Sequence, residues 1–331
     1  MAKRIGRSVA ISFFIAGVLV LAGCILPTSN ALPIARFSSH ALGGYAYAPL
    51  TLLCDAGTST DPDGRIVAYN WDFGDGETGT GVTVSHAYAA PGTFAVMLHV
   101  RDNRNGVHST ETQISVLQTP AGQILRRYQW TTQDGPQYLE TLLPEALYQH
   151  YYNQLRQPFY GNYDYDDYVL DPLDDPTLED LAGTLWTRAG GGYEAFLEYA
   201  LSFVQGAIAY TPDPAGVEYP LYPLETLVNT AGGDCEDTTI LFVNLLTARG
   251  YSALMAHVDT DADSTPDHVL ALVPVTASFA GAIVCHPGNN KGVWEIEGQL
   301  YALAETAGFS LPLGCDPWGL EISDFKQTWS L

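Results

Sequence analysis

Gly232–Asp237 reads Gly-Gly-Asp-Cys-Glu-Asp, and a strongly apolar stretch follows it as far as Gly250. This pattern predicts a largely buried helix over Cys235–Arg249, because a glycine directly after the last apolar turn is a natural helix stop. The first N–H groups of a helix and its positive dipole end stabilise a thiolate. Cys235 is therefore a candidate nucleophile.

The carboxylates of Asp234, Glu236 and Asp237 act against that role, because neighbouring negative charge raises the pKa of a thiol. The sulfur therefore needs a cationic imidazole in contact with it, and we expect His268 to supply it. Glu305, at the end of a later apolar run, is the acid expected to orient the ring. A thiol, an imidazole and a carboxylate are the parts of a cysteine acyl-transfer site.

Residues 176–314 are predicted to form an α+β domain around this site. Helical patterns begin at Asp175 and cover Gly192–Tyr210 before the cysteine helix. Strands are expected after it, at Ala253–Val258, His268–Val275, Val293–Ile296 and Leu300–Glu305. Helices first and strands afterwards indicate a helical layer packed on a sheet.

Two further segments complete this half of the chain. Residues 118–175 are rich in Tyr, Gln, Asp and Pro, and they are predicted to form an irregular connection with a helix near Leu139–Leu155. Residues 315–331 are predicted to be a C-terminal tail.

The first half of the chain has the pattern of an all-β domain over residues 33–117. Apolar side chains alternate along Phe94–Val100, and turn residues recur at short intervals, as in Asp61–Gly64. The stretch Tyr69–Gly76 reads Tyr-Asn-Trp-Asp-Phe-Gly-Asp-Gly. With His86–Tyr88 it resembles a polycystic-kidney-disease (PKD) repeat domain.

That resemblance implies an immunoglobulin-like β-sandwich of a kind found in extracellular spacer and adhesion modules. We expect Trp71 and Phe73 to fill the sandwich core. Asp72 and Asp75 are expected to bond backbone N–H groups in a glycine turn, and the domain is assigned no chemistry.

The second half resembles a transglutaminase-like domain of the papain-like cysteine peptidase type, over about Tyr128–Gly314. The resemblance rests on Tyr222–Leu227 (Tyr-Pro-Leu-Glu-Thr-Leu), Gly233–Asp237, Asp267–His268 and Glu305–Thr306. It implies a nucleophilic cysteine, an acid–base histidine and an orienting acid, namely Cys235, His268 and Glu305. This chain has Glu305 where the family usually has an aspartate. Gln205 and the Cys235 N–H are candidate oxyanion donors.

Asp259–Asp267 carries carboxylates at Asp259, Asp261, Asp263 and Asp267, spaced as at the start of a calcium-binding loop. A structural calcium ion there would fix the strand that carries His268, and the alternative is a solvated acidic turn. Catalysis itself requires no cofactor.

Residues 1–24 have the pattern of an export signal, with Lys3, Arg4 and Arg7 before an apolar run. The segment ends in Leu-Ala-Gly-Cys and resembles a bacterial lipobox, which implies lipidation of Cys24. The mature chain would then be a lipoprotein held to a membrane and facing the cell exterior or periplasm. An uncleaved anchor and an ordinary cleavage nearby are the alternatives.

The charge of the chain limits its partners, and its cysteines bear on whether Cys235 is free. The chain has 14 basic and 37 acidic residues, a net charge of −23, which excludes phosphate backbones and hence nucleic acid as a partner. An exported chain tends to pair its thiols. Pairing Cys285 with Cys315 would leave Cys235 free, although Cys54 and these three cysteines allow three full connectivities.

Together these features predict an exported cysteine acyl-transfer enzyme that hydrolyses peptide or amide bonds in a protein or peptide substrate. Transfer to a lysine amine would instead make it a cross-linking transglutaminase. The rival from another class is a catalytically inactive scaffold or adhesion protein with the same domains.

Overall fold

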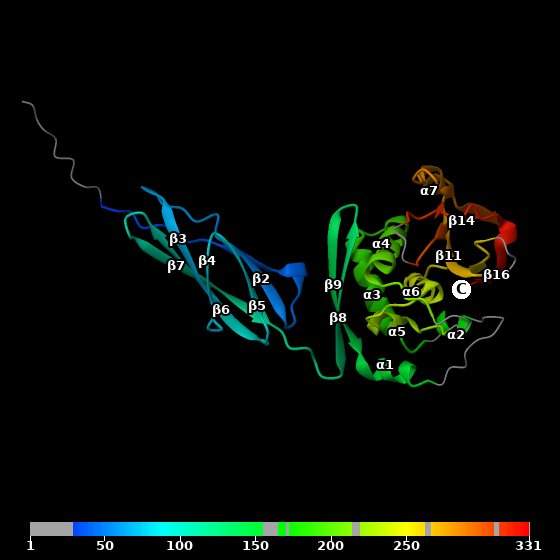
Figure 1. Cartoon of the computed structure of the whole chain (residues 1–331), viewed down its shortest axis with the longest axis horizontal. Coiled ribbons are helices and arrows are strands. Elements are labelled where there is room, and N and C mark those ends of the chain that lie inside the picture. The colour runs from blue at the N-terminus through cyan, green and yellow to red at the C-terminus, as the bar shows by residue number, and fades with distance from the viewer. Residues whose placement is uncertain are drawn as a thin grey trace, which may run out of the picture.

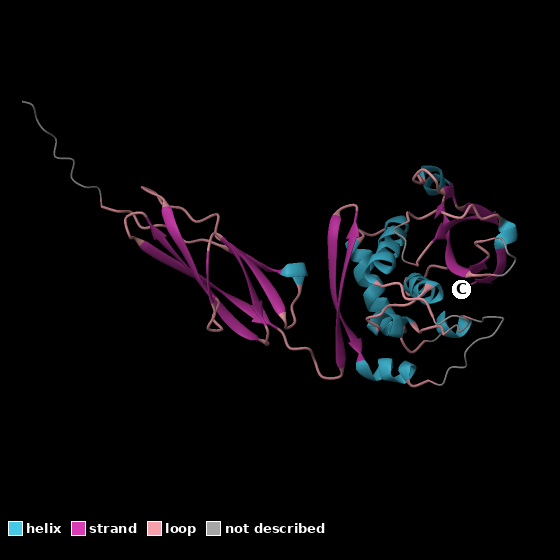
Figure 2. Cartoon of the chain, viewed as in Figure 1, coloured by secondary structure: helices cyan, strands magenta, loops and turns pink. Residues whose placement is uncertain are grey.

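The structure is a computed structural model of the chain, and it describes residues 29–154, 165–169, 172–213, 219–261, 266–307 and 311–330. A β-sandwich comes first, a long two-stranded hairpin follows, and a mixed helix-and-sheet domain completes the chain (Figures 1 and 2). The predicted export signal with Cys24 lies outside the described residues, as does Asp263.

Two antiparallel sheets form the sandwich. The first has the order β1-β2-β5 and the second β4-β3-β6-β7. Their bounds are β1 Ser38–Ala41, β2 Leu50–Asp55, β3 Ile66–Asp72, β4 Thr78–Thr80, β5 Thr83–Tyr88, β6 Gly92–Asp102 and β7 Val107–Val116, with a short 3-10 helix η1 at Leu42–Gly44.

The sandwich core is built as the Trp-Asp-Phe pattern predicts. Trp71 and Phe73 are buried between the sheets, while Asp72 accepts a bond from the Gly74 N–H at 2.9 Å. Asp75 likewise accepts from the Glu77 N–H at 3.1 Å. The expectation that these carboxylates serve the turn is confirmed.

The predicted irregular connection over residues 118–175 is wrong in its first part. Strands β8 (Gln123–Thr132) and β9 (Gly135–Pro144) form an antiparallel hairpin there, and helix α1 (Glu145–Tyr152) follows. Tyr128 and Trp130 alternate with exposed or half-exposed residues and are buried against α4. A composition rich in polar residues concealed this period-two pattern.

The hairpin also attaches to the sandwich. Arg127 on β8 forms an ion pair with Glu140 on β9 at 2.8 Å and donates to the Tyr47 carbonyl at 2.6 Å. Glu140 accepts from the Ala46 N–H at 2.8 Å, and the Arg127 guanidinium lies over the Tyr45 ring. These contacts tie the end of the sandwich to the second domain.

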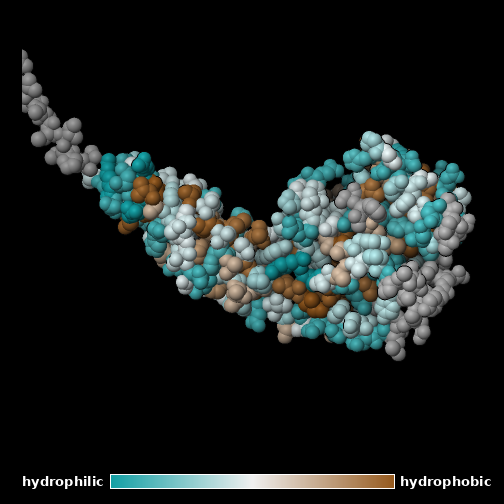
Figure 3. Space-filling view, viewed as in Figure 1, coloured by the Kyte–Doolittle hydropathy of each residue, from teal (hydrophilic) through white to brown (hydrophobic). Residues whose placement is uncertain are grey.

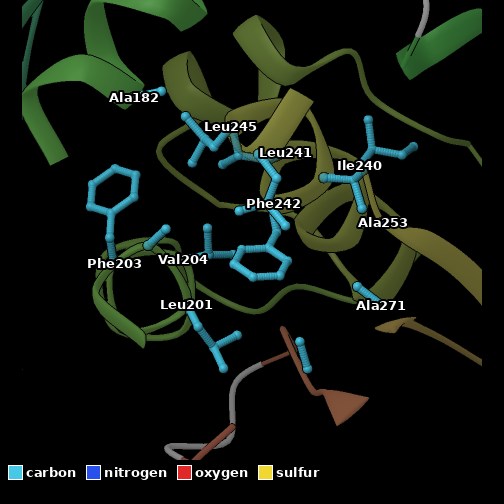
Figure 4. Close-up of a cluster of buried hydrophobic side chains, with 14 of the residues drawn as sticks. Ala182, Leu201, Phe203, Val204, Ile240, Leu241, Phe242, Leu245, Ala253 and Ala271 are labelled. Carbon is cyan, nitrogen blue, oxygen red and sulfur yellow. The ribbon is translucent and has the colours of Figure 1, made fainter. Parts of the chain in front are cut away.

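Helices form one layer of the second domain. They are α2 Asp166–Val169, α3 Asp175–Arg188, α4 Tyr193–Ala207, α5 Pro223–Val228, α6 Cys235–Thr247 and the short α7 Ala277–Ala282. The predicted helices starting at Asp175 and Cys235 begin where expected. Helix α6 is buried along most of its length and packs against α4 and β11 (Figure 4).

The other layer is an antiparallel sheet of order β13-β14-β11-β10-β16. Its strands are β10 Leu254–Val258, β11 His268–Val275, β13 Val293–Ile296, β14 Gln299–Ala304 and β16 Phe325–Ser330, beside a small pair of β12 Asn290–Lys291 and β15 Cys315–Asp316. The four predicted strands are present. The tail predicted at 315–331 is wrong, because β16 pairs with β10 at the sheet edge.

The molecular surface seen in Figure 3 is mostly hydrophilic or neutral, with scattered apolar residues. Within the described ranges, no helix has the length and apolar character needed to cross a membrane.

Candidate functional site

The start of α6 is fixed by a bridge between two distant segments. Tyr210 pairs with Gly233 in parallel fashion, with Thr211 N–H donating to the Gly233 carbonyl at 2.9 Å and Gly233 N–H donating to the Ala209 carbonyl at 3.1 Å. Gly232 has φ +87°, and a Cβ there would overlap the Ala209 carbonyl. Only glycine fits this position, and Cys235 consequently enters the first turn of α6 at a defined place.

The Cys235 thiol is partly exposed and carries no disulfide. Burial raises its pKa well above the ordinary value, and the Glu236 and Asp234 carboxylates raise it further. The Val269 backbone N–H acts in the opposite direction. The predicted effect of the neighbouring acids is confirmed for Asp234 and Glu236. The thiol donates a hydrogen bond to Glu236 Oε2 at 3.4 Å, and within the described residues it makes none with His268.

His268 and Glu305 meet as the sequence predicts. His268 Nε2 lies 2.7 Å from Glu305 Oε2, and the other oxygen of Glu305 accepts from the Ala307 N–H at 2.7 Å. Glu305 is 1% exposed. The Trp318 ring packs on the imidazole, with 4.9 Å between centroids. One imidazole nitrogen is therefore held by a buried acid, which leaves Nδ1 to exchange a proton.

Three hydroxyls bind these elements together behind the site. Thr239, in the first turns of α6, donates to the Val269 carbonyl at 3.3 Å and lies 2.8 Å from the Thr306 hydroxyl. Thr238 lies 3.0 Å from the same Thr306 hydroxyl. Hence hydrogen bonds join the segments that carry Cys235, His268 and Glu305, within a few residues of each of these side chains.

The prediction that Gln205 is an oxyanion donor is wrong. Its side-chain amide donates to the Glu305 carbonyl at 2.6 Å and to the Leu311 carbonyl at 3.0 Å. Both bonds use the same nitrogen and tether the loop behind Glu305 to α4. Gln205 also lines a pocket of about 910 Å³ beside the hairpin tip, which neither Cys235 nor His268 lines.

Tyr210 is the site residue that sequence reasoning missed. Burial raises the pKa of Tyr210 to about 12, and the Cys235, Asp234, Glu236 and Glu305 charges raise it in that order. The phenol therefore lies near both Cys235 and Glu305. No local sequence signal indicates this, because the Gly233 bridge alone brings Tyr210 to the helix start.

Asp213, Asp234 and Glu236 form a group that could hold a metal ion. Their ligand atoms lie within 4.8 Å of one another, and Asp234 Oδ2 accepts from the Asp213 N–H at 3.1 Å. Asp234 Oδ1 is buried and has no hydrogen-bond partner among the described residues. Carboxylate oxygens are the ligands that calcium prefers, so the donor set fits a hard divalent cation.

In the loop predicted to bind calcium, two of the described carboxylates have partners within the protein. Asp267 accepts from both the N–H and the hydroxyl of Thr260 at 2.8 Å, and Asp259 is buried 3.8 Å from the Lys326 ammonium. Asp261 is described, whereas Asp263 is not. Calcium binding by this loop stays a prediction.

The remaining cysteines leave the thiol free. Cys285 and Cys315 form a disulfide, the pairing expected to spare Cys235, and Cys54 is buried in the sandwich. Asp316, next to Cys315, accepts bonds from the backbone N–H groups of Trp318, Gly319 and Leu320. The disulfide thus lies in the loop that presents Trp318 to His268.

Comparison with known proteins identifies the class of the first domain. Residues 46–116 match the family described as "PKD domain", so the chain contains a PKD domain.

Similar proteins match over the same part of the chain. Collagenase ColQ1 of Bacillus cereus (strain Q1) is 45% identical over 58 residues, 18% of this chain and 6% of the collagenase. The pre-pro-metalloprotease PrtV of Vibrio cholerae is 37% identical over 93 residues, 28% of this chain and 9% of that protein. The chain therefore spans less than a tenth of the length of either relative.

A solved structure of the PKD1 domain of V. cholerae PrtV is 31% identical, with a TM-score of 0.23 over 26% of this chain and 98% of that one.

Proposed function

We propose that this protein is an exported cysteine acyl-transfer enzyme that hydrolyses peptide or amide bonds. Cys235 would be the nucleophile, His268 the general acid and base, and Glu305 the acid that orients the imidazole. The observation that carries the proposal is the 2.7 Å bond between His268 and the buried Glu305. His268 directly precedes Val269, whose N–H lies near enough to the Cys235 sulfur to lower the pKa of the thiol. A transglutaminase-like fold for the second domain belongs to the same proposal.

The chemistry follows from this arrangement. His268 Nδ1 takes the thiol proton, and the sulfur attacks the carbonyl carbon of the substrate to form a tetrahedral intermediate. The imidazolium then returns its proton to the leaving amine, and a thioester forms on Cys235. Water, activated by the same nitrogen, releases the acid. Glu305 stabilises the imidazolium that exists between these two proton transfers.

The acceptor distinguishes hydrolysis from cross-linking. Water needs no binding pocket, and this favours hydrolysis, whereas a transglutaminase would deliver the acyl group to a lysine amine. Export is the part of the proposal that agrees with a PKD domain similar to those of a collagenase and a metalloprotease. Lipidation at Cys24 rests on the sequence of residues 1–24 alone.

An inactive scaffold or adhesion protein is the second candidate, and one observation favours it. The pKa of the Cys235 thiol is raised by burial and by Glu236 and Asp234, which keeps the sulfur protonated near neutral pH in the absence of a compensating positive charge. The thiol would then be inert, and the two domains would serve only as a binding surface.

The test measures acylation of Cys235 directly. The full chain is mixed with p-nitrophenyl acetate, with and without calcium, and the acylated peptide is identified by mass spectrometry. We expect one acyl group on Cys235, formed at least about 100-fold more slowly in His268→Ala. His99→Ala, a histidine on β6 of the sandwich that bonds Ser109, is the matched control and should react like the unmodified chain.

Two further readouts separate the alternatives. A dansylated primary amine supplied with a protein mixture becomes incorporated if the enzyme cross-links, whereas new N-termini appear if it hydrolyses. Equal labelling of the unmodified chain and His268→Ala, or no acylation of Cys235, would rule out the enzyme and leave the scaffold.

A further inference from the structure

We propose that Tyr210 is a catalytic residue, whose hydroxyl donates a hydrogen bond to the substrate oxyanion formed when Cys235 attacks. The inference rests on the proposed function and adds to it a donor that Gln205 cannot supply, since the Gln205 amide is occupied by the Glu305 and Leu311 carbonyls.

The backbone places Tyr210 at the thiol. Its bridge to Gly233 lies two residues before Cys235, and the flanking Ala209 and Thr211 bonds secure both sides of it. The two segments approach so closely at Gly232 that a Cβ there would overlap the Ala209 carbonyl. Tyr210 is thus attached to the same backbone turn that presents Cys235.

The side chain is available for a substrate. Tyr210 is 48% exposed, and its hydroxyl has no hydrogen-bond partner in the described part of the chain. The phenol also interacts electrostatically with Cys235 and Glu305, so it lies near both side chains. Other tyrosines of the chain, such as Tyr128 and Tyr88, instead donate to backbone carbonyls.

The surrounding charge gives this donor a defined task. Attack by Sγ forms the C–S bond and moves the carbonyl π electrons onto oxygen, which becomes negative near Asp234, Glu236 and Glu305. A neutral O–H donor stabilises that oxygen without adding negative charge, and the raised pKa keeps Tyr210 protonated. The Cys235 N–H, which has no acceptor within its own helix, is the second donor.

The oxyanion returns its electrons when the leaving group departs. The carbonyl re-forms as the bond to the amine nitrogen breaks, and His268 supplies the proton that the amine requires. Tyr210 therefore donates a hydrogen bond throughout but transfers no proton, so phenylalanine removes its whole contribution.

Two reagents separate this role from any effect on the thiol. Iodoacetamide alkylates Cys235 by displacement and forms no oxyanion, whereas p-nitrophenyl acetate acylates it through one. We expect Tyr210→Phe to slow acylation about 100-fold and to leave alkylation unchanged. Tyr152→Phe, an exposed tyrosine on α1, is the matched control and should change neither rate.

The outcomes are distinct. Acylation of Tyr210→Phe at the unmodified rate would overturn this inference and leave the proposed function intact. A parallel loss of acylation and alkylation would also overturn it, because Tyr210 would then act on the thiol or on the fold. Failure of the unmodified chain to be acylated at Cys235 would overturn both proposals.

Discussion

The two domains contain the same polar pair in different surroundings. In the PKD domain His86 Nε2 lies 2.7 Å from Asp75 Oδ2, and in the second domain His268 Nε2 lies 2.7 Å from Glu305 Oε2. Both bonds join an imidazole Nε2 to a carboxylate oxygen at the same distance, so a histidine–carboxylate bond does not by itself identify a catalytic site.

The neighbours of each pair make the difference. The His86 ring stacks on Phe73 at 4.0 Å between centroids, and its acid also caps the turn at Glu77, which makes this pair a clamp on the sandwich surface. The side chain of Glu305 has no exposed surface, and the strand that carries His268 is joined to the cysteine helix by the bond from Thr239 to the Val269 carbonyl. The first pair lacks both a fully buried acid and a free cysteine on the helix packed against its strand.

The largest expected difference between the two pairs appears when the acid of each pair is replaced by its amide. We expect Glu305→Gln to lower kcat/KM by roughly 10³- to 10⁴-fold, because an amide cannot stabilise the imidazolium and fixes the wrong tautomer. Asp75→Asn should leave kcat/KM unchanged. The measurement is steady-state hydrolysis by both variants beside the unmodified chain. Similar activity in Glu305→Gln would reduce the second pair to a clamp like the first.

The next largest effect is expected from replacing one glycine in each domain by alanine, which tests how strongly each backbone turn requires glycine. Gly76 has φ +96° and open space around it, whereas Gly232 has φ +87° and faces the Ala209 carbonyl. Alanine at Gly76 should cost about 1–2 kcal/mol for the left-handed conformation alone. Alanine at Gly232 adds a backbone overlap and should destabilise by more than about 3 kcal/mol.

Urea unfolding followed by hydrogen exchange of each domain measures both changes. Equal losses would mean that the Gly232 turn relaxes at no cost and that the Tyr210–Gly233 bridge is not the fixed point that we infer.

The sequence predicted those features that local patterns encode. The Trp71–Phe73 alternation and the apolar run after Cys235 specify buried faces over a few neighbouring residues. The pairing of Glu305 with His268 was expected from a resemblance that Thr306, next to Glu305, helps to carry. In each case the signal lies within one element or one motif.

The missed features depend on pairing between distant segments. Strand β16 becomes a strand because β10 offers it an edge, and Tyr210 reaches the site because Gly233 pairs with it. Gln205 was assigned incorrectly for the same reason, since the carbonyls that occupy it follow it by about a hundred residues. Such contacts arise from the whole fold and leave no local pattern.

The carboxylates of the two domains also differ in their hydrogen-bond partners. Calcium binding tests this difference, with a smaller expected effect on stability. Asp72 and Asp75 each bond a backbone N–H, whereas Asp234 keeps one buried oxygen without a partner beside Asp213 and Glu236. Calcium at ten times its Kd should stabilise the second domain by about 1.4 kcal/mol, or about 4 °C in Tm.

Thermal melting in calcium and in chelator, with two variants, locates the ion. Asp234→Asn should abolish the shift, and Asp267→Asn should keep it. The reverse result would place calcium in the loop predicted from the sequence, 259–267, and would leave the three acids beside Cys235 without a cation.

The smallest expected effect is a pH dependence of the first pair. Burial alone would raise the pKa of Asp75, but the bonds from His86 and from the Glu77 N–H outweigh burial and hold it below the ordinary value. A carboxyl whose folded pKa is depressed stabilises the fold above its unfolded pKa of about 4 and loses that contribution as the pH falls through the folded pKa. Asp75→Asn should therefore lower the Tm of the PKD domain at pH 7, and the Tm values of the variant and the unmodified chain should converge near pH 2.

Glu111→Gln, at an exposed position on β7, is the control, and its Tm should show no such convergence. A Tm difference that stays constant from pH 7 to pH 2 would mean that packing on Phe73, and not the charge of Asp75, holds His86 in place. The resemblance between the two pairs would then be one of distance alone.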